Sequence, residues 1–343
     1  MEFMTPIDLK QLPSPISYAD KILLVGSCFT EHIGNSLKEL KFDVMQNPNG
    51  ILFDPASVCA SLISYIENVP LTAKDFFELN EVWNSWAHHS RYSHISLDEA
   101  VHQANESRQR AHDFLKQADW IIVTLGSSFS YRLRQDQVSE PVYTGDSSGL
   151  LPVANCHRAP ATWFTKHLME IGETITLLDT CYYRLRIFNP KIKILFTVSP
   201  VRHLRDGVVE NNRSKARLIE AVHHMTGKFD HLFYFPAYEL VIDILRDYRF
   251  YDTDFAHPNY AATGFVLEKF SESCIDPGSQ KIMSEVRKLM IARKHRALQP
   301  ATNAHRQFLL AHHEKAKELQ AKFPFLDLAE EISYFKDAAN EIG

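Results

Sequence analysis

Features typical of nucleotide-binding and membrane proteins are missing from the sequence. Neither of the glycine-rich phosphate loops G-x-G-x-x-G and G-x-x-x-x-G-K-[ST] occurs, so a nucleotide is disfavoured and we expect no cofactor. No apolar run approaches the ~18–20 residues that span a bilayer. Residues 1–20 contain Asp8, Lys10 and three prolines, and they lack the basic and apolar segments of a signal peptide. We therefore expect a cytoplasmic protein with no membrane span.

Disulfide pairs and metal-binding spacings are missing as well. The cysteines are odd in number and form no C-x-x-C pair, which favours reduced thiols over a disulfide framework. The 17 histidines show neither an H-E-x-x-H motif nor a clustered Cys/His spacing, so we expect no metal site. The five cysteines are Cys28, Cys59, Cys156, Cys181 and Cys274.

The composition is that of an ordinary globular protein. Of the 343 residues, 45% are hydrophobic and 23% are charged, which is enough for a large core. The net charge of −5 disfavours nucleic acid as a partner. An Asp-Pro-Gly turn predicts a boundary between a main domain, residues 1–275, and a helical C-terminal extension, residues 276–343.

Short apolar strands alternate with helices through the main domain. This alternation implies right-handed crossovers and a parallel sheet covered on both faces. We therefore predict an α/β fold, a three-layer α/β/α sandwich with about five parallel strands. Two segments have less regular patterns: residues 76–96 are interpreted as a functional loop or lid, and residues 131–158 as an irregular segment. Residues 160–187 are predicted to form one long helix. The predicted strands cover residues 21–26, 42–46, 120–126, 193–200 and 232–235.

The first strand ends in Gly26-Ser27-Cys28, and an amphipathic helix follows at once. A hydroxyl at this turn lies at the carboxyl end of a strand and at the positive end of a helix. Ligands usually bind at such a place in open α/β sheets. Ser27 is therefore the predicted nucleophile. The alternative is that Ser27 only caps the helix, as serine often does.

A serine nucleophile needs a base that takes its proton. His257 is the predicted base because Asp254 stands three residues before it in a loop rich in turn-forming residues. A carboxylate in that place can hold the imidazole tautomer and stabilise the imidazolium. Ser27, Asp254 and His257 thus form a predicted triad. Alternatively, Asp254 and His257 pair only to stabilise their own loop.

Four groups that follow strand ends are candidate donors to an oxyanion. They are the amide of Ser27 or Cys28, the amide of Gly50, the turn that contains Ser128, and the Asn155 side chain. Each of the last three has a purely structural alternative. Gly50 can serve only to permit a turn, Ser128 can cap a second helix, and Asn155 can satisfy backbone groups of its own loop.

The segment Gly26-Ser27-Cys28-Phe29-Thr30 resembles the G-S-C-F-A signature of the GSCFA-domain family, with Thr30 in place of the usual alanine. The resemblance covers roughly residues 5–270. The family is placed in the SGNH/GDSL hydrolase superfamily, which implies the flavodoxin-like strand order and ester hydrolysis through an acyl-enzyme. Further similar segments are residues 47–53, 85–91, 153–157 and 197–203.

The match to the SGNH sequence blocks leaves the nucleophile open. If Ser27 is the serine of the G-D-S block, the aspartate of that block is missing. Read column by column, Cys28 falls where the hydrolase serine stands, and a thiol at a helix N-terminus is expected to have a depressed pKa. In the other blocks Gly50 matches the glycine, Ser128 replaces the asparagine, and Asp254 and His257 match D-x-x-H in full.

Together these features predict an SGNH-like esterase, deacetylase or acyltransferase. The polar loop at 76–96, rich in tryptophan and histidine, suggests a small-molecule or carbohydrate ester as the substrate, and His89 and His157 are expected to line the pocket. One alternative is a non-catalytic ligand-binding module, because the aspartate and asparagine of the hydrolase blocks are missing. Others are a Cys28-dependent acyl-transfer enzyme and a scaffold that forms oligomers through its C-terminal helices.

Overall fold

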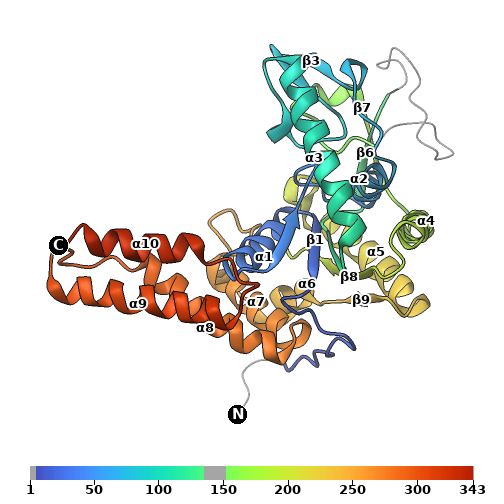
Figure 1. The fold of residues 1–343 in the computed structure, drawn as a ribbon. Coiled ribbons are helices and arrows are strands. Elements are labelled where there is room, and N and C mark those ends of the chain that lie inside the picture. Colours follow the sequence, from blue (N-terminus) through green and yellow to red (C-terminus); the bar gives the residue numbers. More distant parts are fainter. Residues whose placement is uncertain (1–4, 135–151, 343) are drawn as a thin grey trace.

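The computed structural model describes residues 5–134 and 152–342. A five-stranded parallel sheet lies at its centre, in the order β2-β1-β5-β8-β9 (Figure 1). Counted along the chain, these sheet strands have the order 2-1-3-4-5, which is the flavodoxin-like order predicted from the sequence. The strands are β1 (Lys21–Gly26), β2 (Asp43–Gln46), β5 (Trp120–Leu125), β8 (Lys193–Val198) and β9 (Leu232–Tyr234).

Alternate residues of the strands face two separate apolar clusters, because strand side chains have a period of two. Ile22 and Leu24 belong to the cluster under α1 (Cys28–Glu39) and α7 (Tyr260–Cys274). Leu23 belongs to the opposite cluster, which four helices cover. The predicted three-layer α/β/α sandwich is thereby confirmed. The four helices are α2 (Pro55–Glu67), α3 (Leu97–Gln117), α4 (Ile171–Phe188) and α5 (Gly207–Lys228).

Two antiparallel strand pairs lie outside the central sheet, and both correct the sequence analysis. The hairpin of β3 (Phe77–Leu79) and β4 (Val82–Asn84) lies inside the segment interpreted as a loop. The second pairs β6 (Phe129–Leu133) with β7 (Phe164–Leu168), so the predicted helix at 160–187 was wrong over residues 160–170.

The reason for the second correction is local. Phe164-Thr165 is a pair of residue types that favour strands. The helix α4 starts only after the capping box of Glu170 and Glu173, in which side chains satisfy the first free amides of a helix.

The C-terminal extension continues one of the two apolar clusters. Leu309 of α9 (Asn303–Lys322) and Phe335 of α10 (Ala329–Asn340) share a cluster with Ile22 of the sheet. Figure 1 shows α9 and α10 side by side as an arm that projects from the sandwich. The helix α8 (Pro277–Lys294) begins at the N-cap Asp276, and the domain boundary at 275/276 stays a prediction.

A short helix and a π-helical segment follow strand β9. They are α6 (Ala237–Glu239) and the π-helical segment Leu240–Leu245. No helix among the described residues is long and apolar enough to cross a membrane.

Candidate active site

Ser27 lies where the sequence predicted, between the carboxyl end of β1 and the first turn of α1. It occupies the N-cap position, but its side chain accepts no capping hydrogen bond. Only 3% of the residue is exposed, and its hydroxyl has no hydrogen-bond partner among the described residues. Buried polar atoms are nearly always paired, so helix capping does not account for this serine.

Cys28 is the first residue of α1 and is half-buried. Burial raises the pKa of its thiol, although the amides of Phe29 and Cys28 act in the opposite direction. The depressed pKa expected from the helix terminus was therefore wrong. A thiol with a raised pKa holds little thiolate at neutral pH, which does not favour Cys28 as a thiolate nucleophile.

Asp254 and His257 lie together in the loop that precedes α7. The ring Nδ1 of His257 lies 2.6 Å from Oδ2 of Asp254. The other carboxylate oxygen accepts from the amides of Ala256 at 2.9 Å and His257 at 3.0 Å. These bonds, led by the amide of His257, hold the pKa of Asp254 well below its ordinary value. With Nδ1–H directed to the carboxylate, Nε2 of the neutral ring is left as the acceptor.

The segment after β8 holds this loop beside the strand ends. The backbone amide of Arg202 donates to the carbonyl of Ala256 at 3.0 Å. The guanidinium of Arg202 donates to the carbonyl of Phe255 at 3.3 Å. The charge of His257 also lowers the pKa of His203 in the same segment. The structure therefore brings Asp254 and His257 together, and it leaves their hydrogen bond to Ser27 unformed.

Three of the predicted oxyanion donors are bonded elsewhere. The amide of Ser27 donates to the carbonyl of Thr124 at 3.1 Å. The amide of Gly50 donates to the carbonyl of Asn47 at 2.7 Å. The backbone of Gly50 has φ of +82°, and a Cβ there would lie 2.2 Å from the Cβ of His89. The hydroxyl of Ser128 is buried against helix α5, where it donates to the carbonyl of Ser214 at 3.1 Å. None of these arrangements supports an oxyanion role.

Asn155 and the two predicted pocket histidines belong to a neighbouring cluster of loops. Asn155 accepts the amide of His157 at 2.8 Å and so closes its own turn. A ring nitrogen of His157 lies 2.9 Å from the carbonyl oxygen of Ser85. The ring of His89 accepts the amide of Arg91 at 3.3 Å. Burial lowers the pKa of both histidines, so both rings are neutral at neutral pH.

The sequence analysis missed His203, which lies close to Ser27. A Cβ placed on Gly126 would be 3.2 Å from Nε2 of His203 and 3.4 Å from Cβ of Ser27. The Nε2 atom is buried and has no partner among the described residues. Burial, followed by the charge of Lys215, lowers the pKa of His203 to about 4. The one available signal was its place just after a predicted strand, in a segment that resembles the family.

Lys215 of α5 was missed as well. Its side chain is buried, with 1% of the residue exposed. Its Nζ donates to the carbonyl of Gly126 at 2.5 Å and to that of Ser199 at 2.6 Å. It thus joins the carboxyl ends of β5 and β8 directly behind the site. Burial lowers the pKa of Lys215 to about 7, and no sequence pattern distinguished it from Lys228, the exposed lysine at the end of the same helix.

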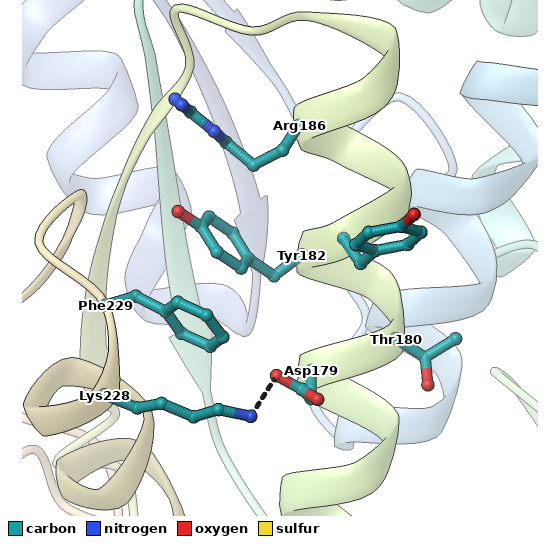
Figure 2. A pocket seen from close by; sticks show the side chains of 7 residues that line it. Asp179, Thr180, Tyr182, Arg186, Lys228 and Phe229 are labelled. Carbon is teal, nitrogen blue, oxygen red and sulfur yellow. Dashed lines mark hydrogen bonds and ion pairs between the residues drawn. The ribbon is translucent and has the colours of Figure 1, made fainter.

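A cavity of about 600 Å³ lies away from this site, between α4 and the end of α5 (Figure 2). Tyr182 and Phe229 pack against each other in its wall, with ring centroids 4.6 Å apart. Lys228 pairs with Asp179 at 2.9 Å at its lower edge. Because Lys228 and Phe229 precede β9, the cavity lies at the amino ends of the strands, whereas Ser27 lies at their carboxyl ends.

A smaller cavity of about 290 Å³ adjoins the His257 loop. Its walls carry aromatic, acidic and basic side chains, and Arg202 stacks over the ring of Tyr251 at 4.2 Å. The lining residues are Arg202, Ile242, Asp243, Arg246, Asp247, Tyr248 and Tyr251.

Among the described residues, no group of three or more histidine, cysteine or acidic side chains is placed to hold a metal ion.

The fold and the site define a doubly wound α/β protein with a buried serine and an Asp–His pair on the carboxyl side of its sheet. The chain belongs to the GSCFA family, because the model described as GSCFA family matches residues 21–270. A second model, described as GSCFA domain protein, C-terminal domain, matches residues 286–341. The family predicted from the sequence is therefore confirmed.

Similar solved structures include two esterases. A carbohydrate esterase family 3 protein from Talaromyces cellulolyticus is 10% identical with a TM-score of 0.32, and the match covers 78% of this chain and 99% of that one. An acetyl xylan esterase from the rumen bacterium Butyrivibrio proteoclasticus is 11% identical with a TM-score of 0.35, and the match covers 76% of this chain and 65% of that one. Among curated proteins, none matches the chain.

Proposed function

We propose that the protein is a serine ester hydrolase of the SGNH type that cleaves a small acylated carbohydrate. The observation that carries the proposal is the buried hydroxyl of Ser27, unpartnered at the carboxyl end of β1. The hydrogen-bonded pair of Asp254 and His257 lies on an adjoining loop. A nucleophile, a base and a group that orients the base are the parts that acyl transfer by serine requires.

In this mechanism Oγ of Ser27 attacks the ester carbonyl carbon while Nε2 of His257 takes the hydroxyl proton. The imidazolium then gives that proton to the leaving alcohol, and an acyl-enzyme remains. Water attacks the acyl carbon with His257 again as base, which releases the acid and restores Ser27. Asp254 keeps the ring in the required tautomer and stabilises its charge.

The attack requires the Ser27 and His257 side chains to approach each other, because their hydrogen bond is unformed without substrate. Such hydrogen bonds are often long before substrate binds. The ring of His257 is 48% exposed, so a movement of the ring together with its loop meets little steric resistance. Its carboxylate partner is equally exposed and belongs to the same loop, so the pair can move as a unit.

The carbohydrate part of the proposal is supported by the cavity of about 290 Å³ beside the His257 loop. Tyr248 is 66% exposed there, and a sugar ring can stack on such an aromatic face. Asp243 and Arg246 line the same cavity and offer hydrogen bonds to sugar hydroxyls.

The test is a panel of chromogenic esters and acetylated sugars, assayed with the wild type, Ser27→Ala and Cys28→Ala. We expect turnover by the wild type, a loss of at least ~10³-fold in Ser27→Ala, and little change in Cys28→Ala. A fluorophosphonate probe should label the wild type and leave Ser27→Ala unlabelled. Equal labelling of both proteins would refute the serine mechanism. A loss confined to Cys28→Ala would identify the thiol as the nucleophile, and ligand binding without turnover would indicate a binding module.

A further inference from the structure

Two buried polar atoms without partners lie on either side of Gly126. They are Oγ of Ser27 and Nε2 of His203. The point that a Cβ of Gly126 would occupy is 3.2 Å from that nitrogen and 3.4 Å from Cβ of Ser27. Since buried polar atoms are nearly always paired in folded proteins, two such atoms at one place indicate a group that binds between them.

A side chain at position 126 would collide with Cβ of Phe53 at 2.9 Å and crowd both atoms, so glycine is required between them, and its backbone is firmly held. Its amide donates to the carbonyl of Phe53 at 2.7 Å, and its own carbonyl accepts from Lys215 at 2.5 Å. The ring of His203 packs against that of Phe53, with centroids 5.1 Å apart. The amide of His203 donates to the side chain of Asn211 at 2.9 Å. The ring is therefore fixed by its surroundings.

The surroundings of His203 keep its ring uncharged. Burial is the largest cause of its low pKa of about 4, and the positive charges of Lys215 and His257 act in the same direction. Lys166 on β7 also lowers the pKa of the ring, and the carboxylate of Asp206 opposes these effects. At neutral pH the ring is a neutral imidazole, which donates one hydrogen bond. A neutral imidazole can polarise a substrate carbonyl.

We propose that His203 is a further catalytic residue whose neutral ring donates a hydrogen bond from Nε2 to the oxyanion of the tetrahedral intermediate. The proposal rests on the proposed function. When Ser27 attacks, the Oγ–C bond forms, the carbonyl π electrons move to oxygen, and the hydroxyl proton goes to His257. His203 stabilises that oxygen without giving up its proton. It thereby supplies a donor that Gly50 and Ser128, bonded elsewhere, do not.

The experiment compares His203→Leu and His203→Gln with the wild type on the best ester of the panel. Leucine removes the donor, so we expect kcat to fall by ~10²–10³-fold with little change in KM. Glutamine keeps an N–H donor but cannot act as a base, so we expect it to recover at least ~10-fold of that loss. The pH–rate profile of His203→Gln should match that of the wild type, because His257 remains the base.

A matched control is His112→Leu, because His112 is also partly buried but bonds the carbonyl of Tyr65 outside the site. Its activity should be unchanged, and thermal melting of each variant checks folding. Wild-type activity in His203→Leu, with Ser27→Ala inactive, would overturn this inference alone. Equal losses in His203→Leu and His203→Gln would overturn it in favour of His203 as a base. A wild type that neither turns over an ester nor reacts with the fluorophosphonate would overturn the proposed function and this inference together.

Discussion

Replacing Lys215 with methionine tests how a buried ammonium group changes the stability of the protein with pH. Its ammonium group is buried behind the site and bonds two backbone carbonyls. Burial lowers its pKa from 10.5 to about 7. In the unfolded chain the same lysine keeps its proton up to about pH 10.5, so between pH 7 and 10.5 the unfolded state binds more protons. The free energy of unfolding therefore rises with pH in this window.

The size of the effect follows from the shift. A difference of 3.5 pKa units, from 10.5 to about 7, corresponds to about 5 kcal/mol of destabilisation that is complete below pH 7. Between pH 7 and pH 9 this group alone should raise the free energy of unfolding by about 2 kcal/mol. Methionine cannot titrate, so the wild type should gain that amount relative to Lys215→Met.

Urea unfolding of both proteins at pH 7, 8 and 9 measures the difference. The two lost hydrogen bonds to carbonyls lower the stability of Lys215→Met equally at each pH. The test is therefore how the difference in free energy of unfolding between the two proteins changes with pH. Lys228→Met is the matched control, because Lys228 lies at the surface in an ion pair with Asp179. A difference between wild type and Lys215→Met that stays constant from pH 7 to 9 would refute the reasoning.

Three further predictions concern the site and its loops. Gly50→Ala should lower the free energy of unfolding by ~1–3 kcal/mol in chemical denaturation, because φ is +82° and the new Cβ would lie 2.2 Å from that of His89; an unchanged midpoint would contradict this. Asp254→Asn should lower kcat by ~10²–10⁴-fold in the ester assay through loss of the imidazole tautomer, and full activity would show that the pair only stabilises its loop. Alkylation of Cys28 by iodoacetamide should be slow at pH 7 and accelerate as the pH rises above 9, because burial raises the pKa of its thiol; fast labelling at pH 7, followed by mass spectrometry, would contradict this.

The central sheet could be predicted because its strands are buried on both faces. All six residues of Trp120–Leu125 are buried, and such continuous apolar runs are recognisable without any knowledge of the partner strand. The strand Phe164–Leu168 was missed because it is only partly buried and is stabilised by its pairing with Phe129–Leu133. That pairing depends on contacts between segments more than thirty residues apart.

The candidate site was predicted in part for similar reasons. Asp254 and His257 are three residues apart, so their hydrogen bond is local and a short pattern reveals it. The place of His203 beside Ser27 depends on the side-by-side arrangement of β1, β5 and β8. The bonds of Ser128 to α5 depend on that arrangement as well, which is why its expected role received no support.

The buried carboxylate of Glu331 has a consequence for any shortened version of the protein. Glu331 on α10 is 1% exposed, and it pairs with Lys41 at 2.8 Å and with Arg293 at 2.6 Å. Lys41 directly follows the helix that begins beside Ser27. A fragment that ends at residue 275 would expose to water the apolar face that now packs against α8–α10. We expect such a fragment to aggregate on expression, so the regions matched by the two family models have to be produced as one chain.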